Sequence, residues 1–368
     1  MQANRSNSLL KKLSLFTAGS RSWRRPLFAG LVVAPLAMLS GSGCLGYLVR
    51  AGYGQMEILW NRRPVTEVLA DPDVPEKIKA KLRHMADVRE YAREHIGLET
   101  GETYTEYTHI DRDAAAYNVT AAQELALVPK TWWFPIVGRV PYLGYFSREE
   151  ALEKERELKA EGLDTRVRDV PAYSTLGWFD DPVLSSQMRY SEWYLTSLVI
   201  HESTHATLWF PGDVNFNESF ASFVEEKGSL QYVLDRKGKN SEQYRRVVRY
   251  LDETEKLATT FRAFASEMKQ ALADARTDDE KRAAKREVIE SMRADFRARR
   301  REFQIVDVER LIATDYNNTH FLAYLRYESG GDFFEKEFRG CNADWACFFK
   351  KMRKLRELSV EERAGLLH

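Results

Sequence analysis

The sequence has no surplus of either charge and very little cysteine. Its 368 residues include 55 lysines and arginines and 55 aspartates and glutamates, so the formal net charge is zero. Nucleic-acid-binding proteins usually carry a basic surplus, and we therefore expect no nucleic-acid partner. Three cysteines are too few for a disulfide-framework mini-protein or an all-cysteine zinc module. A glycine-rich nucleotide loop and internal repeats are also missing, whereas 44% apolar residues allow a sizeable core.

Long hydrophobic runs are absent as well. The apolar run at residues 27–39 is interrupted by Gly30 and Pro35, and its length falls short of the roughly 20 residues that a membrane-spanning helix needs. Basic residues precede the run, small residues follow it, and the first acidic residue is Glu57. This order is typical of an export signal. We therefore assign residues 1–43 to a signal peptide and residues 44–368 to the mature protein.

Cys44 follows small residues at positions 40–43 and resembles the cysteine of a bacterial lipobox, although Gly41 stands where leucine is usual. The resemblance implies lipidation of Cys44 and a membrane anchor for a periplasmic domain. Leu45 differs from the acidic retention signal of some inner-membrane lipoproteins, which favours the outer membrane. An ordinary signal with a free cysteine, or an uncleaved anchor, stays open.

The other two cysteines, Cys341 and Cys347, lie six positions apart. In an exported protein a disulfide between them is the expected state, with two free thiols as the alternative. A metal site built on this pair is not expected, because His320 and the terminal His368 are the only histidines in this part of the sequence.

Apolar spacing predicts a helix-rich α+β fold without a firm domain boundary in residues 45–368. Helices are predicted between Cys44 and Pro64 and at residues 74–97, 147–162, 188–209 and 217–236. Strand-like segments lie at residues 103–107, 132–138 and 165–170. Residues 241–310 form a highly charged helical insertion, predicted as a long hairpin that turns at residues 277–279. Its simplest interpretation is a solvated hairpin, and its functional alternative is a lid that restricts access to short peptides.

A short motif on the predicted helix 188–209 carries the chemistry. The sequence reads His-Glu-x-x-His at residues 201–205. Residues four apart share one helical face, so His201 and His205 can bind the same zinc ion. Glu202 is then adjacent to the metal without binding it and can act as general base. A site with three histidines is excluded, because Leu208 and Pro211 occupy the positions that such a pattern requires as glycine and histidine.

A catalytic zinc site usually has three protein ligands and one open position, so a third ligand is needed. Glu218 is the preferred candidate, because it begins the next predicted helix and has twelve residues between it and His205. Asp213 in the connecting loop is the first alternative. Glu225 and Glu226 are weaker alternatives, because they lie two helical turns further on.

Groups that could contact the substrate are less distinct. A donor for the developing oxyanion is expected in such a site, and the candidates for oxyanion or substrate contacts are Tyr173, His320, Tyr324 and Tyr327. For each of these, an ordinary core or surface position is a commoner role than that of a catalytic donor.

Three further segments each have a functional and a structural interpretation. Residues 165–170 are either an edge strand that holds the substrate backbone or an ordinary strand. Asn317 and Asn318 either orient a zinc ligand or cap a helix. Asp180 and Asp181 either capture a free α-amine or form a turn.

Longer segments around the motif resemble a known family. Residues 172–182, 201–207 and 216–221 are similar to the bacterial predicted aminopeptidases, a gluzincin-like group, and further likeness at residues 54–65, 133–138, 142–146 and 317–318 extends over nearly all of the mature protein. The resemblance implies a zincin-like fold with a small sheet before the motif helix. It also implies one Zn²⁺ held by His201, His205 and Glu218, with Glu202 as the catalytic base.

The expected function is therefore a zinc metallopeptidase of the bacterial envelope, an aminopeptidase that hydrolyses short peptides. Two alternatives remain open: a non-catalytic envelope lipoprotein with a structural zinc site, and an amidase that acts on cell-wall peptides. The partners expected are a peptide substrate and a membrane, the latter through Cys44. The sequence predicts no oligomeric state.

Overall fold

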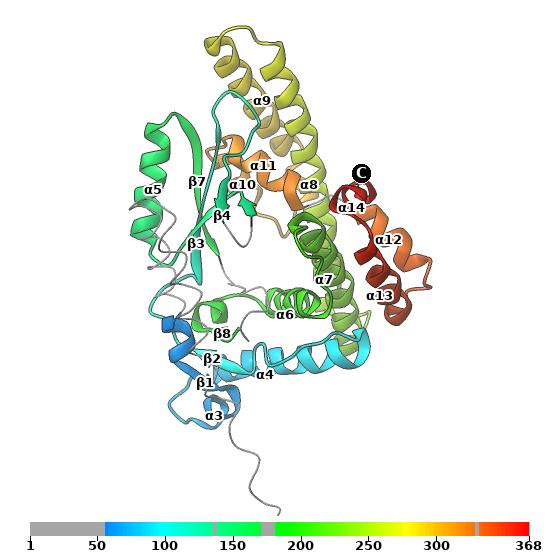
Figure 1. The fold of residues 1–368 in the computed structure, drawn as a ribbon. Helices are drawn as coiled ribbons and strands as arrows, with labels where there is room; N and C mark the ends of the chain where they lie inside the picture. Colours follow the sequence, from blue (N-terminus) through cyan, green and yellow to red (C-terminus); the bar gives the residue numbers. More distant parts are fainter. Residues whose placement is uncertain (1–55, 135–137, 171–180, 328–330, 368) are drawn as a thin grey trace, which may run out of the picture. The chain divides into compact units, whose positions relative to one another are not determined.

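The computed structural model describes residues 56–134, 138–170, 181–327 and 331–367 (Figure 1). The predicted signal peptide, Cys44, Tyr173 and Asp180 lie outside the described residues. Residues 54–368 form a unit of their own. None of the helices in the described part of the chain is both long and apolar enough to cross a bilayer.

The first described elements are mostly helical. The order is β1 (Arg62–Pro64), α3 (Val65–Ala70), α4 (Glu76–Tyr91) and a π-helical turn (Ala92–Ile96), which ends at Gly97 in a left-handed conformation. The helix predicted at 74–97 is thus confirmed. The short helix α3, directly after Pro64, was not expected. Proline favours the first turn of a helix as well as the end of the preceding one, so the residue alone does not decide between them.

Small sheets precede the motif helix, as expected for an α+β protein. In one, β3 (Ala116–Gln123) lies between β6 (Leu143–Tyr145) and β7 (Leu163–Val170), and both pairings are antiparallel. Helix α5 (Arg148–Ala160) packs on β3 and β7 and begins at Ser147, whose side chain accepts a hydrogen bond from Glu150 N. A second sheet has the order β1, β2 (Glu106–Thr108), β8 (Val183–Leu184), and β4 (Trp132–Phe134) pairs with β5 (Gly138–Val140).

Helices α6 (Glu192–Thr207) and α7 (Val214–Lys237) lie side by side, and α4 packs against α6 (Figure 1). The helix predicted from residue 188 begins later, because residues 185–189 form a 3-10 turn and Ser191 caps α6. A Cβ at Gly228 would lie 2.7 Å from Ile96 Cδ1 and 3.3 Å from Ile200 Cγ2. Glycine at this position therefore permits the close approach of α7 to its neighbours.

The predicted charged hairpin is present as α8 (Glu242–Asp274) and α9 (Asp278–Ala298). Thr277 and Glu280 form a capping box at the start of α9, which places the turn as expected. The hairpin has its own hydrophobic cluster, which includes Phe261, Met292 and Phe296. It is therefore a packed element rather than two solvated helices.

The remaining chain is helical and closes onto α7 and the hairpin. It contains a 3-10 turn (Arg300–Glu302), α10 (Val308–Ala313), α11 (Asn318–Tyr327), α12 (Gly331–Arg339), α13 (Trp345–Lys354), a 3-10 turn (Leu355–Glu357) and α14 (Val360–Leu366). Cys341 and Cys347 are joined by a disulfide between α12 and the first turn of α13. Helices α12 and α13 cover α7 with aromatic side chains, among them Phe334 and Phe348, which contact Phe220 and Phe223.

Candidate metal centre

The connection between α6 and α7 is held by a dense set of polar contacts. Asn217 donates through Nδ2 to the carbonyl oxygens of Phe210 and Asp213 and accepts through Oδ1 from Phe210 N. Asp213 caps α7 through Phe216 N and forms a buried ion pair of 2.8 Å with Arg363 of α14. These contacts fix the entry angle of α7. The next residue after Asn217 is Glu218, and its side chain is thereby directed towards α6.

Three side chains converge between the two helices. The Nε2 atoms of His201 and His205 lie 3.1 Å apart. Glu218 places Oε2 3.5 Å from His201 Nε2 and Oε1 3.6 Å from His205 Nε2. Ligands 2.0–2.1 Å from a tetrahedral zinc ion are separated by about 3.3 Å. The donor atoms of this triad are therefore spaced as a metal site requires, and the triad could hold a metal ion.

Glu225, two turns further along α7, contacts the opposite ring nitrogen of His201. The Nδ1 of His201 donates to Glu225 Oε2 at 2.9 Å. A carboxylate at this position would keep a proton on Nδ1 when a metal ion binds, which leaves the lone pair of Nε2 for the ion. Glu225 thus orients a candidate metal ligand and is not itself a member of the triad. The corresponding Nδ1 of His205 is buried and has no hydrogen-bond partner within the described part of the chain.

The electrostatics of the triad favour a positive charge between the imidazoles. Burial would lower the pKa of His201, but its hydrogen bonds to Glu218 and Glu225 and the charge of Glu202 raise it well above the ordinary value. Burial and the His201 charge lower the pKa of His205 to about 4. Burial would raise the pKa of Glu218, yet His201 and His205 hold it below its usual value. Several carboxylates around two imidazoles therefore suit a divalent cation.

Two tyrosines near Glu202 were not among the residues predicted from the sequence. Tyr194 lies seven residues before His201 on the same face of α6. Burial raises its pKa, and the charges of Glu225 and Glu202 raise it further. Tyr104 is buried with φ 65°, and its N–H donates to Asp181 O; burial and the Glu202 charge raise the pKa of its hydroxyl. Helical spacing could have identified Tyr194, whereas Tyr104 is brought here only by the tertiary fold.

The structure separates the alternatives for the third ligand. Glu218 faces both imidazoles. Asp213 does not, because its carboxylate caps α7 and pairs with Arg363. Glu226 is exposed and pairs with Lys227. Asp213, the alternative ligand in the loop, thus has a structural role at the start of α7.

The expected substrate-contact residues lie on α11 or outside the described residues. His320 and Tyr324 lie on α11, where His320 contacts Asn317 and Tyr324 stacks on Phe261 with ring centroids 3.9 Å apart. Tyr173 and the Tyr327 side chain are outside the described residues. Asn317 Oδ1 accepts from Thr319 N, and its Nδ2 donates to the Thr165 carbonyl oxygen. Asn317 therefore caps α11, and the hydrogen bonds of its side chain are not to the triad.

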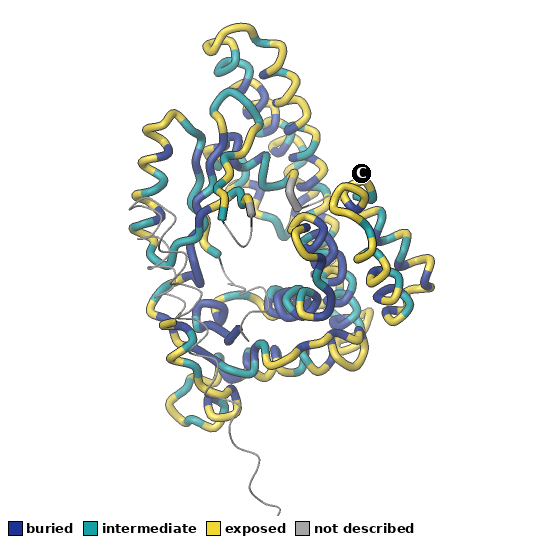
Figure 2. The backbone as a smooth tube through the Cα atoms, in the orientation of Figure 1, coloured by how far each residue is buried: buried dark blue, intermediate teal, exposed yellow. Residues whose placement is uncertain are grey.

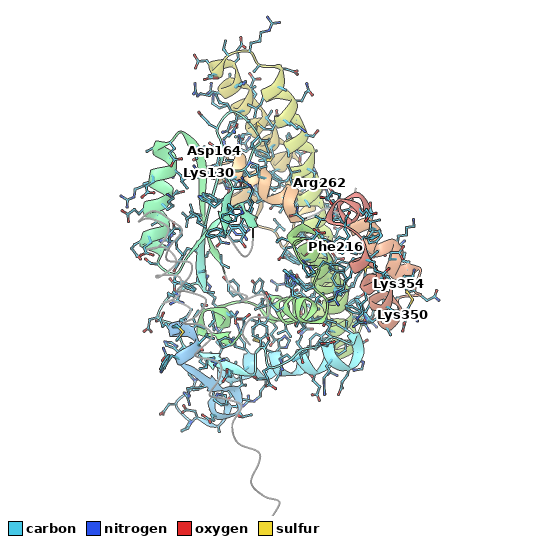
Figure 3. All side chains as sticks on the ribbon, viewed as in Figure 1. Lys130, Asp164, Phe216, Arg262, Lys350 and Lys354 are labelled. Carbon is cyan, nitrogen blue, oxygen red and sulfur yellow. A yellow bond between two sulfur atoms is a disulfide. The ribbon has the colours of Figure 1, made fainter. Side chains whose placement is uncertain are left out.

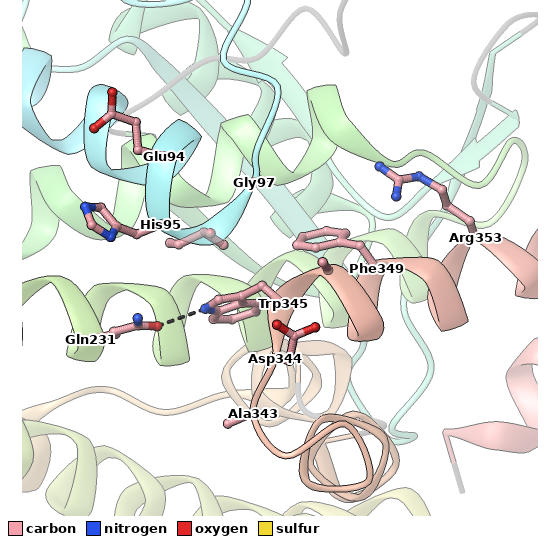
Figure 4. A pocket seen from close by; sticks show the side chains of 11 residues that line it. Glu94, His95, Gly97, Gln231, Ala343, Asp344, Trp345, Phe349 and Arg353 are labelled. Atoms are coloured by element: carbon pink, nitrogen blue, oxygen red, sulfur yellow. Dashed lines mark hydrogen bonds between the residues drawn. The ribbon is translucent and has the colours of Figure 1, made fainter.

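A cavity of about 490 Å³ lies apart from the triad (Figure 4). It is lined by the π-helical turn, which carries His95, and by α13, which carries Trp345 and Arg353. Trp345 Nε1 donates to Gln231 Oε1 at its wall. No member of the triad lines this cavity, so it has no part in the metal centre.

Comparison with known proteins identifies a family. A family model described as "Putative aminopeptidase" matches residues 46–367, which is most of the 368-residue chain. The chain belongs to this family. Membership indicates a peptidase, and the matched range includes both helices of the triad. Searches of curated proteins and of solved structures found no match.

Proposed function

We propose that this family member is a zinc-dependent aminopeptidase of the gluzincin type that hydrolyses short peptides. The observation that carries the proposal is the convergence of His201, His205 and Glu218, with donor atoms 3.1–3.6 Å apart between two packed helices. Within the described chain these three residues are the one His, Cys, Asp or Glu cluster with metal-site spacing. A structural zinc site would need a fourth protein ligand, so three ligands favour catalysis over a structural role.

Glu202 is the group that moves protons in this proposal. A zinc ion bound by the triad would polarise the peptide carbonyl and lower the pKa of a water molecule towards about 7. Glu202 follows His201 on α6 and is partly exposed. Its carboxylate takes the proton of the attacking water and delivers it to the leaving amine. Glu225 keeps His201 in the tautomer that the site requires.

Strand β7 supplies a surface for the substrate backbone. It lies at an edge of its sheet, with β3 as its one partner among the described strands. An extended peptide can pair with such an edge through main-chain hydrogen bonds. Asp169 at the end of β7 lies 3.7 Å from Arg189, just before α6, so this edge leads towards the motif helix.

The proposed location is the periplasmic face of the outer membrane. The export signal at residues 1–43 and the lipobox-like Cys44 support it, because lipidation would tether the domain stably to a membrane. Mass spectrometry of the membrane-extracted protein should find an acylated N-terminal Cys44. An unmodified Cys44 would contradict this part of the proposal and leave the peptidase unaffected.

The decisive experiment joins metal content to activity. The purified mature protein should contain one zinc per chain and should cleave peptides in a screen of aminoacyl reporters, longer peptides and cell-wall fragments. Glu202→Gln should keep the zinc, and its activity should fall by about 10²- to 10⁴-fold. Glu226→Gln, an exposed neighbour on α7, is the matched control and should behave as wild type. A fully active Glu202→Gln protein would contradict the role of Glu202 as general base.

A further inference from the structure

The two faces of β7 have different neighbours. Thr165 donates through Oγ1 to Glu155 of α5, and Leu163 and Val167 pack in the cluster beneath α5. Because successive side chains in a strand point to opposite faces, the residues with even numbers face away from α5. Arg166 and Arg168 belong to that second face.

The second face of β7 runs from the hairpin to the start of α6. Near the beginning of the strand lies Asp164, which is labelled in Figure 3. It binds Lys285 of α9 at 2.5 Å and accepts a hydrogen bond of 2.8 Å from the backbone N–H of Asn318. Near its end, the Arg168 charge lowers the pKa of Tyr194, whose pKa is raised overall by burial. Tyr194 shares its helical face with His201. The face therefore connects the α11 region with the helix that carries the metal centre.

Arg166 lies midway along this face without an anionic partner. Its side chain is half-buried, and it makes no ion pair or side-chain hydrogen bond within the described residues. Asp164, two positions away, is already used by Lys285 and Asn318. Burial, together with the positive charge of Arg168, lowers the pKa of Arg166. A partly desolvated guanidinium without an anion costs free energy unless a ligand supplies the missing charge.

The surroundings of Arg166 add to the demand for an anion. His320 lies on α11, and burial together with the Arg166 charge lowers its pKa to about 4. The residues opposite on β3, Thr120 for Arg166 and Asn118 for Arg168, are neutral and partly exposed. Guanidinium groups bind carboxylates through two parallel hydrogen bonds. The region is thus equipped to bind a carboxylate.

We propose that Arg166, assisted by Arg168, binds the free α-carboxylate of a short peptide whose other end lies at the triad. This inference rests on the proposed peptidase function and names its substrate class. The charges are complementary: the triad end carries Glu202, Glu218 and Glu225, which suit an α-amine, and the β7 end carries two arginines without an ion pair among the described residues. An extended peptide advances about 3.3 Å per residue, so the separation of the two ends would set the length of the peptides that can bind at both.

Matched substrates test this assignment. Three tripeptides are compared. They are trialanine as the free acid, trialanine as its C-terminal amide, and the C-terminal amide of Ala-Ala-Glu. Wild type should cleave the free acid with a kcat/KM roughly 10- to 100-fold above the plain amide, as expected for a charged hydrogen-bonded pair. Arg166→Gln should remove this advantage through KM and leave the amide unchanged. Arg166→Lys should restore part of it, and Arg286→Gln, an exposed arginine on α9, should change nothing.

Binding provides a readout that is independent of turnover. Calorimetry with zinc-loaded Glu202→Gln should show tighter binding of the free acid than of the plain amide, and the added change Arg166→Gln should abolish the difference. Equal binding of acid and amide would overturn the inference. Cleavage of the glutamate amide as efficiently as the free acid would overturn the assignment to the C-terminus, since a side-chain carboxylate would then suffice. If wild type cleaves no peptide, the proposed function fails, whereas the binding comparison still tests Arg166.

Discussion

The motif helix α6 and the hairpin α8–α9 are both long helical elements, but they bury their surfaces differently. From Leu195 to Ile200 every residue of α6 is buried, and α4 and α7 pack against it. In α8 and α9 one stripe is buried and the other faces are exposed and charged (Figure 2). A helix that is enclosed in this way holds its exposed side chains rigidly. The two imidazoles therefore gain a fixed separation that a surface hairpin would not provide.

The two regions also have separate cores. Phe220 belongs to the cluster around α6 and α7, and Phe296 belongs to the cluster of the hairpin. Helix α8 joins them, because Val247 lies in the first cluster and Leu257 in the second. The hairpin also reaches the sheet, where Lys285 binds Asp164. It thus supports β7 as well as its own core, which favours a scaffold over a freely moving lid.

The sharpest test of this comparison removes one phenyl ring from each core. Phe220→Ala and Phe296→Ala should each lower the free energy of unfolding by about 3–5 kcal/mol, because both rings are fully buried. Chemical denaturation measures this loss. At temperatures where both variants are folded, only Phe220→Ala should weaken zinc binding. Equal zinc affinities in the two variants would contradict the division into a site core and a supporting core.

The next effect concerns the support of the triad. Glu225→Gln removes the charged partner of His201 Nδ1 and should weaken zinc affinity by about 10- to 100-fold. Competition with a chelator measures it. Glu287→Gln, an exposed carboxylate on α9, should leave the affinity unchanged. A wild-type affinity in Glu225→Gln would show that the hydrogen bond does not orient the ligand.

A smaller effect is expected at the base of the hairpin. Glu253 is buried, and its carboxylate accepts hydrogen bonds of 2.8 Å from the backbone N–H groups of Gln304, Ile305 and Val306. Glu253→Gln should cost about 1.5–3 kcal/mol of stability at neutral pH, the typical worth of hydrogen bonds to a charged group. Zinc affinity should not change, because these contacts lie in the hairpin region.

The same residue gives a pH dependence. Burial would raise the pKa of Glu253, but the three N–H groups hold it below its usual value of 4.5. As pH falls, Glu253 is therefore protonated in the unfolded chain before it is protonated in the folded protein. The stabilisation by its carboxylate is complete above about pH 5 and is lost as pH falls through the lower pKa of the folded protein. Unfolding curves at pH 7 and at pH 3–4 should therefore differ less in Glu253→Gln than in wild type. An identical pH dependence would contradict the assigned contacts.

The smallest effect should come from the disulfide. Cys341 and Cys347 enclose a short loop, and loop closure of this length is worth about 2 kcal/mol or less. Replacing both with serine should lower the melting temperature modestly and leave zinc content at one per chain. A loss of zinc would mean that α12 and α13 control the triad through α7.

Much of the local structure could be predicted because it depends on neighbouring residues. Ser147 caps α5 as expected, since its side chain accepts a hydrogen bond from the backbone N–H three residues on, and the hairpin turns at the predicted residues, where Thr277 caps α9. The helix spacing of His201 and His205 likewise places both rings on one face. The start of α6 was predicted too early, because the 3-10 turn at residues 185–189 continues the helical pattern.

The sequence by itself determined the motif, the hairpin and the set of carboxylates from which a third ligand could come. Only the tertiary structure decided among those carboxylates. Asn217 holds the loop through its hydrogen bonds, and Arg363 forms an ion pair with Asp213. Glu218 therefore faces the two imidazoles, and Glu225 contacts His201 from the opposite side of its ring. The same holds for Arg166, which has no anionic partner among the described residues once β7 has packed between α5 and α11. Spacing along a helix is local, but the partner of a charge depends on which distant segments the fold brings beside it.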